Sequence, residues 1–113
     1  MVGLKRARNA GVANTCVPYN VVLTVASTQY SQALPTTTIG IEFQNRSNND
    51  LLYAFTTGKV APTTGPGVPT APYFTVKAGQ NEYKDLTFLK DKTIYFASAN
   101  AGDVVELFVW RLL

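Results

Sequence analysis

Apolar residues recur at every second position along most of the chain, and clusters of turn-forming residues cut this alternation into short segments. The clearest case places Ile39, Ile41 and Phe43 on one face, with Gly40 and Glu42 between them. Successive side chains of an extended strand point to opposite faces, so this pattern predicts a β-strand with one buried side. No stretch of about eleven residues or more carries the i, i+3, i+4, i+7 pattern of an amphipathic helix.

Further segments of the same kind, rich in β-branched and aromatic residues, are also predicted to be strands. They are residues 19–26, 30–34, 51–56, 73–76, 83–88, 93–97 and 104–110. Many short strands at close spacing favour an all-β fold, a single two-sheet antiparallel β-sandwich of about 7–8 strands, with a jelly roll as one possible form. The alternative is a small five-stranded nucleic-acid-binding barrel, which needs fewer and longer strands.

The segment 57–72 departs from this alternation. It holds four of the six prolines and three of the eight glycines, and its one charged residue is Lys59. Because proline cannot donate a hydrogen bond within a sheet, the segment is predicted to be a loop. Such a loop is either a surface excursion without a role or a contact loop whose prolines limit the freedom lost on docking. The candidate contact residues of this loop are Val60, Pro62, Pro66 and Pro69.

The excess positive charge is confined to Lys5, Arg6 and Arg8. No acid occurs before residue 21, whereas residues 21–113 carry seven bases and seven acids, so the body of the chain is neutral. This imbalance predicts a basic arm that contacts protein or nucleic acid, in contrast to the alternative of a solubilising tail.

We therefore divide the chain into an extended basic arm, residues 1–18, and one β-sandwich domain, residues 19–113, with the loop at 57–72. A chain of 113 residues is long enough for one domain with one hydrophobic core. Fully extended, the arm spans at most about 60 Å, which is enough to cross a neighbouring subunit.

The residues that carry most enzyme chemistry are scarce. The chain has no histidine and one cysteine, Cys16, which excludes an internal disulfide and an ordinary zinc site. The nearest pairs of acids are Glu82 with Asp85 and Asp103 with Glu106. We predict that the protein is not an enzyme and uses no cofactor, metal or small-molecule substrate. A carboxylate pair of the glycosidase type, facing across a cleft, is the alternative.

Low charge and the absence of long apolar runs indicate how the protein associates and where it is made. Charged residues make up 15% of the chain, against about 25% in typical globular domains, which favours association. No apolar run approaches the roughly 20 residues of a membrane span, and no signal-peptide core follows the basic residues. We expect a soluble protein, made in a cytoplasm, that works within an oligomer or assembly.

The aromatic residues within predicted strands alternate in position and are predicted to be mostly core. They are Phe43, Phe55, Phe74, Phe88, Phe96, Phe108 and Trp110. A second set is a candidate for an exposed sugar-binding or single-strand-binding face, or for a subunit interface. This set is Tyr53, Tyr73, Tyr83 and Tyr95.

Two sequence patterns resemble small virion structural proteins of tailed bacteriophages. The first is Leu23-Thr24 followed by Tyr30-Ser31 and Ala33-Leu34-Pro35, and the second is the strand end Phe43-Gln44-Asn45-Arg46. The likeness continues through residues 52–58, 73–79, 93–98 and 104–110. It covers about residues 20–111 and leaves the basic arm outside.

The resemblance implies a non-enzymatic β-sandwich that is built into a phage virion and assembled in the host cytoplasm. The expected role is a head decoration, cement or minor capsid protein that docks through its arm and long loop, with the neck or tail as the alternative location. The expected partners are the major capsid protein or connector and copies of the same chain, with non-specific contact to packaged DNA and no membrane. A carbohydrate-binding or host-adhesion module is the alternative from another class.

Overall fold

The computed structural model describes residues 14–63, 68–69, 72–86 and 92–112. Its described residues form eight β-strands and no helix, which confirms the all-β prediction. The strands are β1 (Asn14–Leu23), β2 (Tyr30–Ala33), β3 (Thr38–Asn45), β4 (Leu51–Ala54), β5 (Phe74–Val76), β6 (Asn81–Asp85), β7 (Thr93–Ser98) and β8 (Asp103–Leu112).

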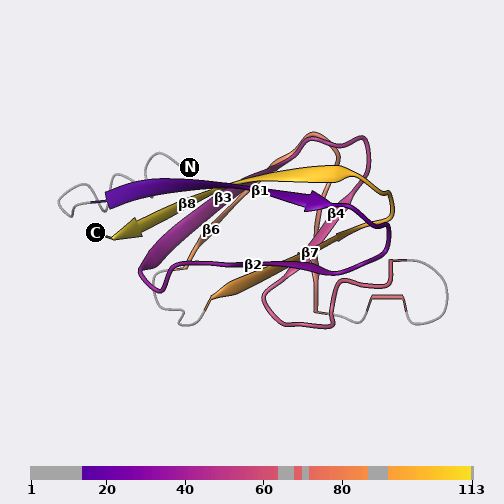
Figure 1. Ribbon diagram of the computed structural model, residues 1–113, viewed down its shortest axis with the longest axis horizontal. Coiled ribbons are helices and arrows are strands. Elements are labelled where there is room, and N and C mark those ends of the chain that lie inside the picture. Colours follow the sequence, from indigo (N-terminus) through magenta and orange to yellow (C-terminus); the bar gives the residue numbers. More distant parts are fainter. Residues whose placement is uncertain (1–13, 64–67, 70–71, 87–91, 113) are drawn as a thin grey trace.

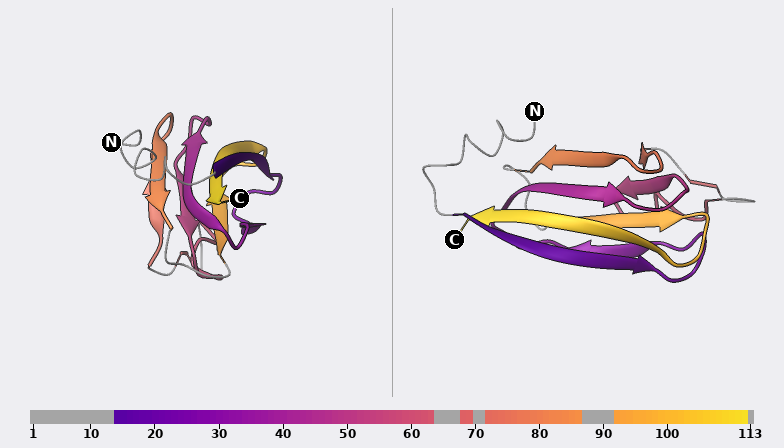
Figure 2. Two further views of the ribbon diagram at one scale, coloured as in Figure 1. Left: turned by 90° about the vertical axis from the view of Figure 1, so that its left-hand side faces the viewer. Right: turned by 90° about the horizontal axis from the view of Figure 1, so that it is seen from above.

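The strands form two antiparallel sheets packed face to face (Figures 1 and 2). One sheet has the order β1-β8-β3-β6 and the other β2-β7-β4-β5. We call them the long sheet and the short sheet, because β1 and β8 have ten residues each and the longest strand of the other sheet, β7, has six. This interlocked order, with the first strand beside the last, is that of a jelly roll, and the predicted two-sheet sandwich is confirmed.

The first strand begins at Asn14, five residues before its predicted start at residue 19. It pairs with β8 along its whole length, from Asn14 opposite Leu112 to Leu23 opposite Asp103. This early start could not be predicted from the sequence, because Pro18 lies within the strand and proline usually ends one. β1 is an edge strand, where the missing amide of a proline can face solvent. Residues 14–18, which we assigned to the arm, are therefore the first half of a strand.

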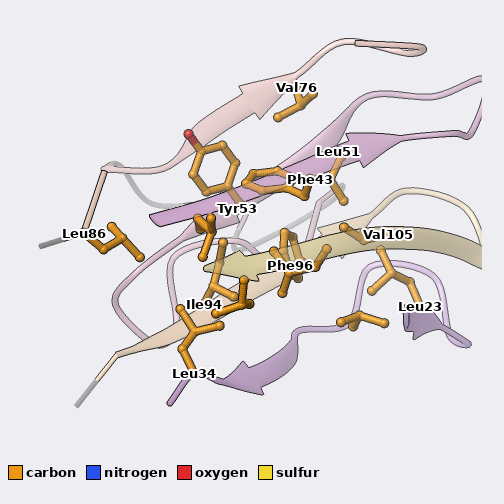
Figure 3. Close-up of a cluster of buried hydrophobic side chains, with 14 residues drawn as sticks. Leu23, Leu34, Phe43, Leu51, Tyr53, Val76, Leu86, Ile94, Phe96 and Val105 are labelled. Atoms are coloured by element: carbon orange, nitrogen blue, oxygen red, sulfur yellow. The ribbon is translucent and has the colours of Figure 1, made fainter. Parts of the chain in front are cut away.

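The core lies between the sheets and is built on the ring of Phe43 (Figure 3). This ring meets Tyr53 and Phe96 edge to face, with ring centroids 4.9 and 5.3 Å apart. Such T-shaped contacts are favourable because the positive edge of one ring meets the negative face of another. The remaining buried members of the cluster are Val21, Leu23, Leu34, Ile41, Leu51, Val76, Leu86, Ile94, Val105, Leu107 and Val109.

The prediction that the strand aromatics are mostly core is wrong for three of them. Phe74 and Phe108 are each 46% exposed, and Trp110 lies half-buried on the outer side of the long sheet. In β8 both faces are apolar, so alternation cannot tell which one is buried. Tyr53, a candidate for an exposed face, is instead fully buried. Phe43 and Phe96 are core as predicted, Phe55 packs against the core, and Phe88 lies outside the described residues.

Charged side chains fill the open side of the sandwich between β6, the edge of the long sheet, and β5, the edge of the short sheet. Glu82 and Lys84 lie opposite Phe43 and Ile41, so both point inward. The phenol Oη of Tyr53 donates a hydrogen bond to Glu82 Oε2 over 2.7 Å. Lys84 Nζ lies 5.1 Å from the ring centroid of Phe74, as in a cation–π contact. Inward charges on an edge strand discourage unwanted strand addition, so β6 is a protected edge.

Removing the central ring will destabilise the fold far more than removing an outer one. We expect Phe43→Ala to lower the free energy of unfolding by about 3–5 kcal/mol, because a fully packed aromatic side chain leaves a cavity. Phe108→Ala, on the outer face, is the matched control and should cost less than about 1 kcal/mol. Urea unfolding followed by circular dichroism measures both, and equal losses would contradict this description of the core.

Stability should also fall at alkaline pH through Tyr53. Burial, with smaller contributions from the hydrogen bond to Glu82 and from its charge, raises the pKa of Tyr53 well above its ordinary value. The folded chain therefore holds this proton more tightly than the unfolded chain does. The resulting stabilisation is complete below pH about 10, the unfolded value, and is lost at higher pH by at most about 1.4 kcal/mol per pH unit.

The comparison with Tyr53→Phe isolates this effect from other groups that titrate at high pH. The variant loses the hydrogen bond to Glu82 and should be less stable at neutral pH. Above pH about 10 its stability should fall less steeply than that of the wild type. Parallel pH dependences of the two unfolding free energies would show that Tyr53 is not the group responsible.

Candidate functional site

The outer face of the short sheet is covered by the loop that follows β4. Val60 is fully buried there and packs with Ala54 and Ala97. Ala54 and Ala97 alternate with the inward-facing residues of β4 and β7, so this small cluster lies on the side of the sheet away from the core. The loop therefore acts as a lid over this face.

Hydrogen bonds tie the same loop to the turn between β1 and β2. The backbone N–H of Gly58 donates to Gln29 Oε1 over 2.7 Å, and Gln29 Nε2 donates to Thr57 Oγ1 over 3.0 Å. Further along, the hydroxyls of Ser27 and Thr63 are hydrogen-bonded, and Thr63 N–H donates to Ser27 Oγ over 3.3 Å. These bonds hold the described part of the loop against the sandwich.

The candidate contact residues of the loop differ in how far the structure buries them. Val60 is buried in the molecule, so its side chain is not a surface contact, and its apolar character serves the lid. Pro62 and Pro69 are partly buried. Pro66 lies outside the described residues, as do Lys5, Arg6 and Arg8 of the predicted arm.

The outer face of the long sheet carries aromatic side chains from β6 and β8, which we call the aromatic face: Tyr83, Phe108 and Trp110. The ring centroids of Phe108 and Trp110 are 6.2 Å apart, and those of Tyr83 and Trp110 are 6.5 Å apart. The three rings form one continuous group, although the sequence places Tyr83 far from the other two. Strand register brings them together, since Glu42 lies opposite both Phe108 and Tyr83.

Gly40 makes this arrangement possible. It lies opposite Trp110 on β8, beneath the ring of Tyr83. A Cβ atom at this position would stand 2.8 Å from Tyr83 Oη and 3.4 Å from its Cζ. A glycine in the middle of a strand often marks such a close approach. The absence of a side chain at Gly40 lets Tyr83 reach across β3 toward Trp110.

A groove of about 380 Å³ opens on the same face. Its walls include Cys16, Phe108 and Trp110, together with the polar side chains of Glu42, Gln44 and Glu106. We call it the acidic groove, because both charged residues that line it are acids. Its volume lies within the range of about 300–1,000 Å³ that is usual for ligand sites, and an apolar floor with a few polar groups is the usual composition.

One of the two acids is held by a cation outside the groove lining. Arg46 Nη1 donates to Glu106 Oε2 over 2.6 Å, and the two side chains are 58% and 37% exposed. An exposed pair of this kind contributes at most about 1 kcal/mol, so it orients Glu106 more than it stabilises the fold. The groove lining itself offers aromatic faces, carboxylates and carboxamides, which suit a cationic or hydroxyl-rich partner.

The two pairs of acids that are close in the sequence do not form a site. The fold instead brings Glu42 and Glu106 into the groove. Glu82 points to the core side and Asp85 lies opposite Gly40 on the outer side. Asp103 accepts a hydrogen bond from Ser98 Oγ over 2.5 Å, and only Glu106 of that pair lines the groove. Glu42 and Glu106 come together through the pairing of β3 with β8, a register that alternation alone does not provide.

A metal site and a membrane-spanning helix are both absent from the described ranges. No three His, Cys, Asp or Glu side chains there gather closely enough to hold a metal ion. In the same ranges, no helix has the length and apolar character needed to cross a bilayer.

Replacing Gly40 should disturb the aromatic face without unfolding the chain. We expect Gly40→Val to push the Tyr83 ring away from Trp110, because the new side chain occupies its place. Trp110 is the one tryptophan of the chain, so its fluorescence emission should shift to longer wavelength as it becomes more solvated. Tyr83→Ala is the control and should give the same shift. Unchanged emission in both variants would disprove this packing.

The chain matches no protein-family model and no curated protein. Among solved structures it is similar to a protein of Bacillus endospore appendages, described as a novel family of disulfide-linked pili. The similarity has a TM-score of 0.51 at 13% sequence identity and covers 90% of this chain and 88% of that chain. At this level of identity the likeness concerns the fold, and it extends over nearly the whole sandwich.

Proposed function

We propose that this chain is a structural subunit without catalytic activity, which assembles with copies of itself into a larger particle or fibre. The observation that carries the proposal is the aromatic face of the long sheet. Phe108 is 46% exposed there, beside the half-buried rings of Trp110 and Tyr83. Exposed aromatic groups of this kind mark interaction surfaces, because removing them from water lowers the free energy.

The two outer faces of the sandwich differ in a way that supports this role. The short sheet is covered by the chain's own lid at Val60, whereas the long sheet presents aromatic rings and an open groove. A β-sandwich of similar fold belongs to bacterial appendages described as pili. That likeness supports an assembling subunit as one use of this architecture, and the choice of partner must come from this chain's own surface.

The basic arm is the second contact in the proposal. Lys5, Arg6 and Arg8 precede the first strand, which starts at Asn14. Three cations on a neutral body bind only weakly as a single copy. Repeated over many copies, the same contact gains avidity without any new interaction.

The sequence resemblance to phage virion proteins favours a more specific form of this proposal. In that form the chain decorates or cements a phage head, with the major capsid protein or a connector as partner. The arm then contacts capsid protein or packaged DNA. The fold is equally compatible with a subunit of a phage head and with a subunit of a fibre. Both require only a rigid sandwich with a surface that binds other subunits.

Self-association is the direct test of the general proposal. We expect the full chain to associate with rising concentration in sedimentation velocity runs, and to form regular particles or fibres in electron micrographs. A chain that lacks residues 1–13 keeps every described strand, because β1 starts at Asn14. Its urea unfolding midpoint should be unchanged, while its dissociation constant should rise at least tenfold. A full chain that stays monomeric at about 100 μM would contradict the proposal, because subunits of assemblies associate far more tightly.

The virion form has its own test. Purified protein is mixed with phage particles that lack it, and particle composition is measured by mass spectrometry. Saturable incorporation at a fixed copy number per particle is expected. Failure to incorporate, together with self-assembly into fibres, would reject the virion form and leave the general proposal standing.

A further inference from the structure

We infer that β1 of one molecule pairs, antiparallel and edge to edge, with β1 of a second copy. This inference rests on the proposed self-assembly and identifies one surface through which two copies meet. In Figure 2 (right), β1 is the outermost strand of the long sheet. Pairing along this edge would join two four-stranded sheets into one sheet of eight strands.

Four strands lie at sheet edges, and three of them offer little to a further strand. β6 turns Glu82 and Lys84 inward, while β5 and β2 have only three and four residues. Inward charges and short length are common forms of edge protection. β1 has ten residues and none of them is charged. It is therefore the longest edge in the described part of the chain, and it lacks both of these forms of protection.

The backbone groups of alternate β1 residues point to this open edge. The carbonyl of Leu23 accepts a hydrogen bond from Gly102 N–H over 2.7 Å, so it faces β8. Backbone groups alternate in direction along an antiparallel strand, so odd-numbered residues of β1 bond to β8 and even-numbered residues face outward. Pro18 thus has its missing donor on the open side. Asn20 and Val22 each present an N–H and a C=O there.

One antiparallel register matches this edge to itself. With Asn20 opposite Asn20 of the second copy, Pro18 of each molecule lies opposite Val22 of the other. The two Asn20 residues then exchange two backbone hydrogen bonds, and each Val22 N–H donates to a Pro18 carbonyl. A register centred on Pro18 would instead set the two prolines against one another and lose both central bonds.

The side chains favour the same register. Val22 is 50% exposed and Pro18 is exposed beside it on the outer face. Directly opposed side chains lie about 5 Å apart, so each Val22 would cover a Pro18 of the other molecule. The exposed carboxamides of the two Asn20 side chains meet at the centre, where each can donate and accept. Apolar groups therefore meet apolar groups and polar groups meet polar ones, which makes a second copy the fitting partner.

Cross-linking at the centre of the pair tests the inference. Asn20→Cys in a full chain that also carries Cys16→Ser leaves one thiol, at position 20. Opposed residues of a hydrogen-bonded pair have Cα atoms about 5.5 Å apart, within the range of a disulfide. Mild oxidation of the associated protein should give a covalent dimer on a non-reducing gel. Ser31→Cys in the same background is the control, at an exposed position of the edge strand β2, and should stay monomeric.

A proline at position 22 should block the contact without disturbing the fold. Val22→Pro removes the outward N–H that donates to Pro18 of the second copy, and this amide takes no part in the bonds to β8. The urea unfolding midpoint should stay close to that of the wild type. The dissociation constant measured by sedimentation should rise at least tenfold, and cross-linking through position 20 should slow by a similar factor.

Ser31→Pro is the matched control for the proline variant. Leu34 N–H donates to Lys92 C=O, so even-numbered residues of β2 face β7 and the amide of Ser31 faces outward. The same substitution is therefore made at an outward amide on a different edge. This variant should associate like the wild type.

Amide hydrogen exchange separates the possible occupants of the edge. In dilute, monomeric protein the amide protons of Asn20 and Val22 should exchange rapidly, because they face solvent. In the assembled protein both should exchange at least tenfold more slowly, while the amide proton of Ser31 should exchange rapidly in both states.

Each remaining outcome rejects a defined statement. A wild type that does not associate rejects the proposed function itself. Association without a cross-link at position 20, and equally strong in Val22→Pro, rejects the edge pairing and leaves the proposed function intact. Slow exchange of the Asn20 and Val22 amides already in the monomer shows that the chain covers its own edge and overturns the inference. Equal cross-linking of Ser31→Cys shows random collision and overturns it as well.

Discussion

The fold depends on the pairing of β8 with a neighbour on each side. β8 is paired with β1 over a register of ten residues and with β3 on its other edge. Its inward residues Val105, Leu107 and Val109 are fully buried between the sheets, and its outward residues Phe108 and Trp110 form most of the aromatic face. One strand therefore supplies both the centre of the core and the surface on which the proposed function depends. A change of register by one residue would exchange the two.

Strand positions could be predicted well from this sequence because alternation and turn residues are local signals. The eight described strands fall where they were expected, with ends displaced by a few residues. The start of β1 was missed because Pro18 looks like a strand breaker, and its tolerance at an edge depends on the partner β8. For a similar reason Tyr53, a candidate for an exposed face, is buried, and Phe108, which was predicted to be core, is exposed. When both faces of a strand are apolar, burial is decided by the facing sheet, and that information is not local.

The candidate site was harder to predict than the fold. Arg46 and Glu106 are 60 positions apart in the sequence yet form an ion pair of 2.6 Å beside the groove. Glu42 and Glu106 become neighbours in the same way, through the register of β3 against β8. Composition did indicate a basic arm on a neutral body, because charge can be counted without a structure. The burial of Val60 could not be predicted, because it packs against Ala54 and Ala97 on two strands that lie outside the loop.

The lid at Val60 limits the symmetry that an assembly of this chain can have. With one broad side closed, adhesive faces that meet directly give a two-fold pair, and that pair cannot grow further. A contact between two unlike surfaces, by contrast, leaves each molecule able to bind a further copy. Depending on the rotation at each step, it closes as a ring or continues as a helix. Because Val60 closes one broad side, a single two-fold contact through the aromatic face stops at a pair, and the proposed larger assembly needs a second contact elsewhere on the molecule.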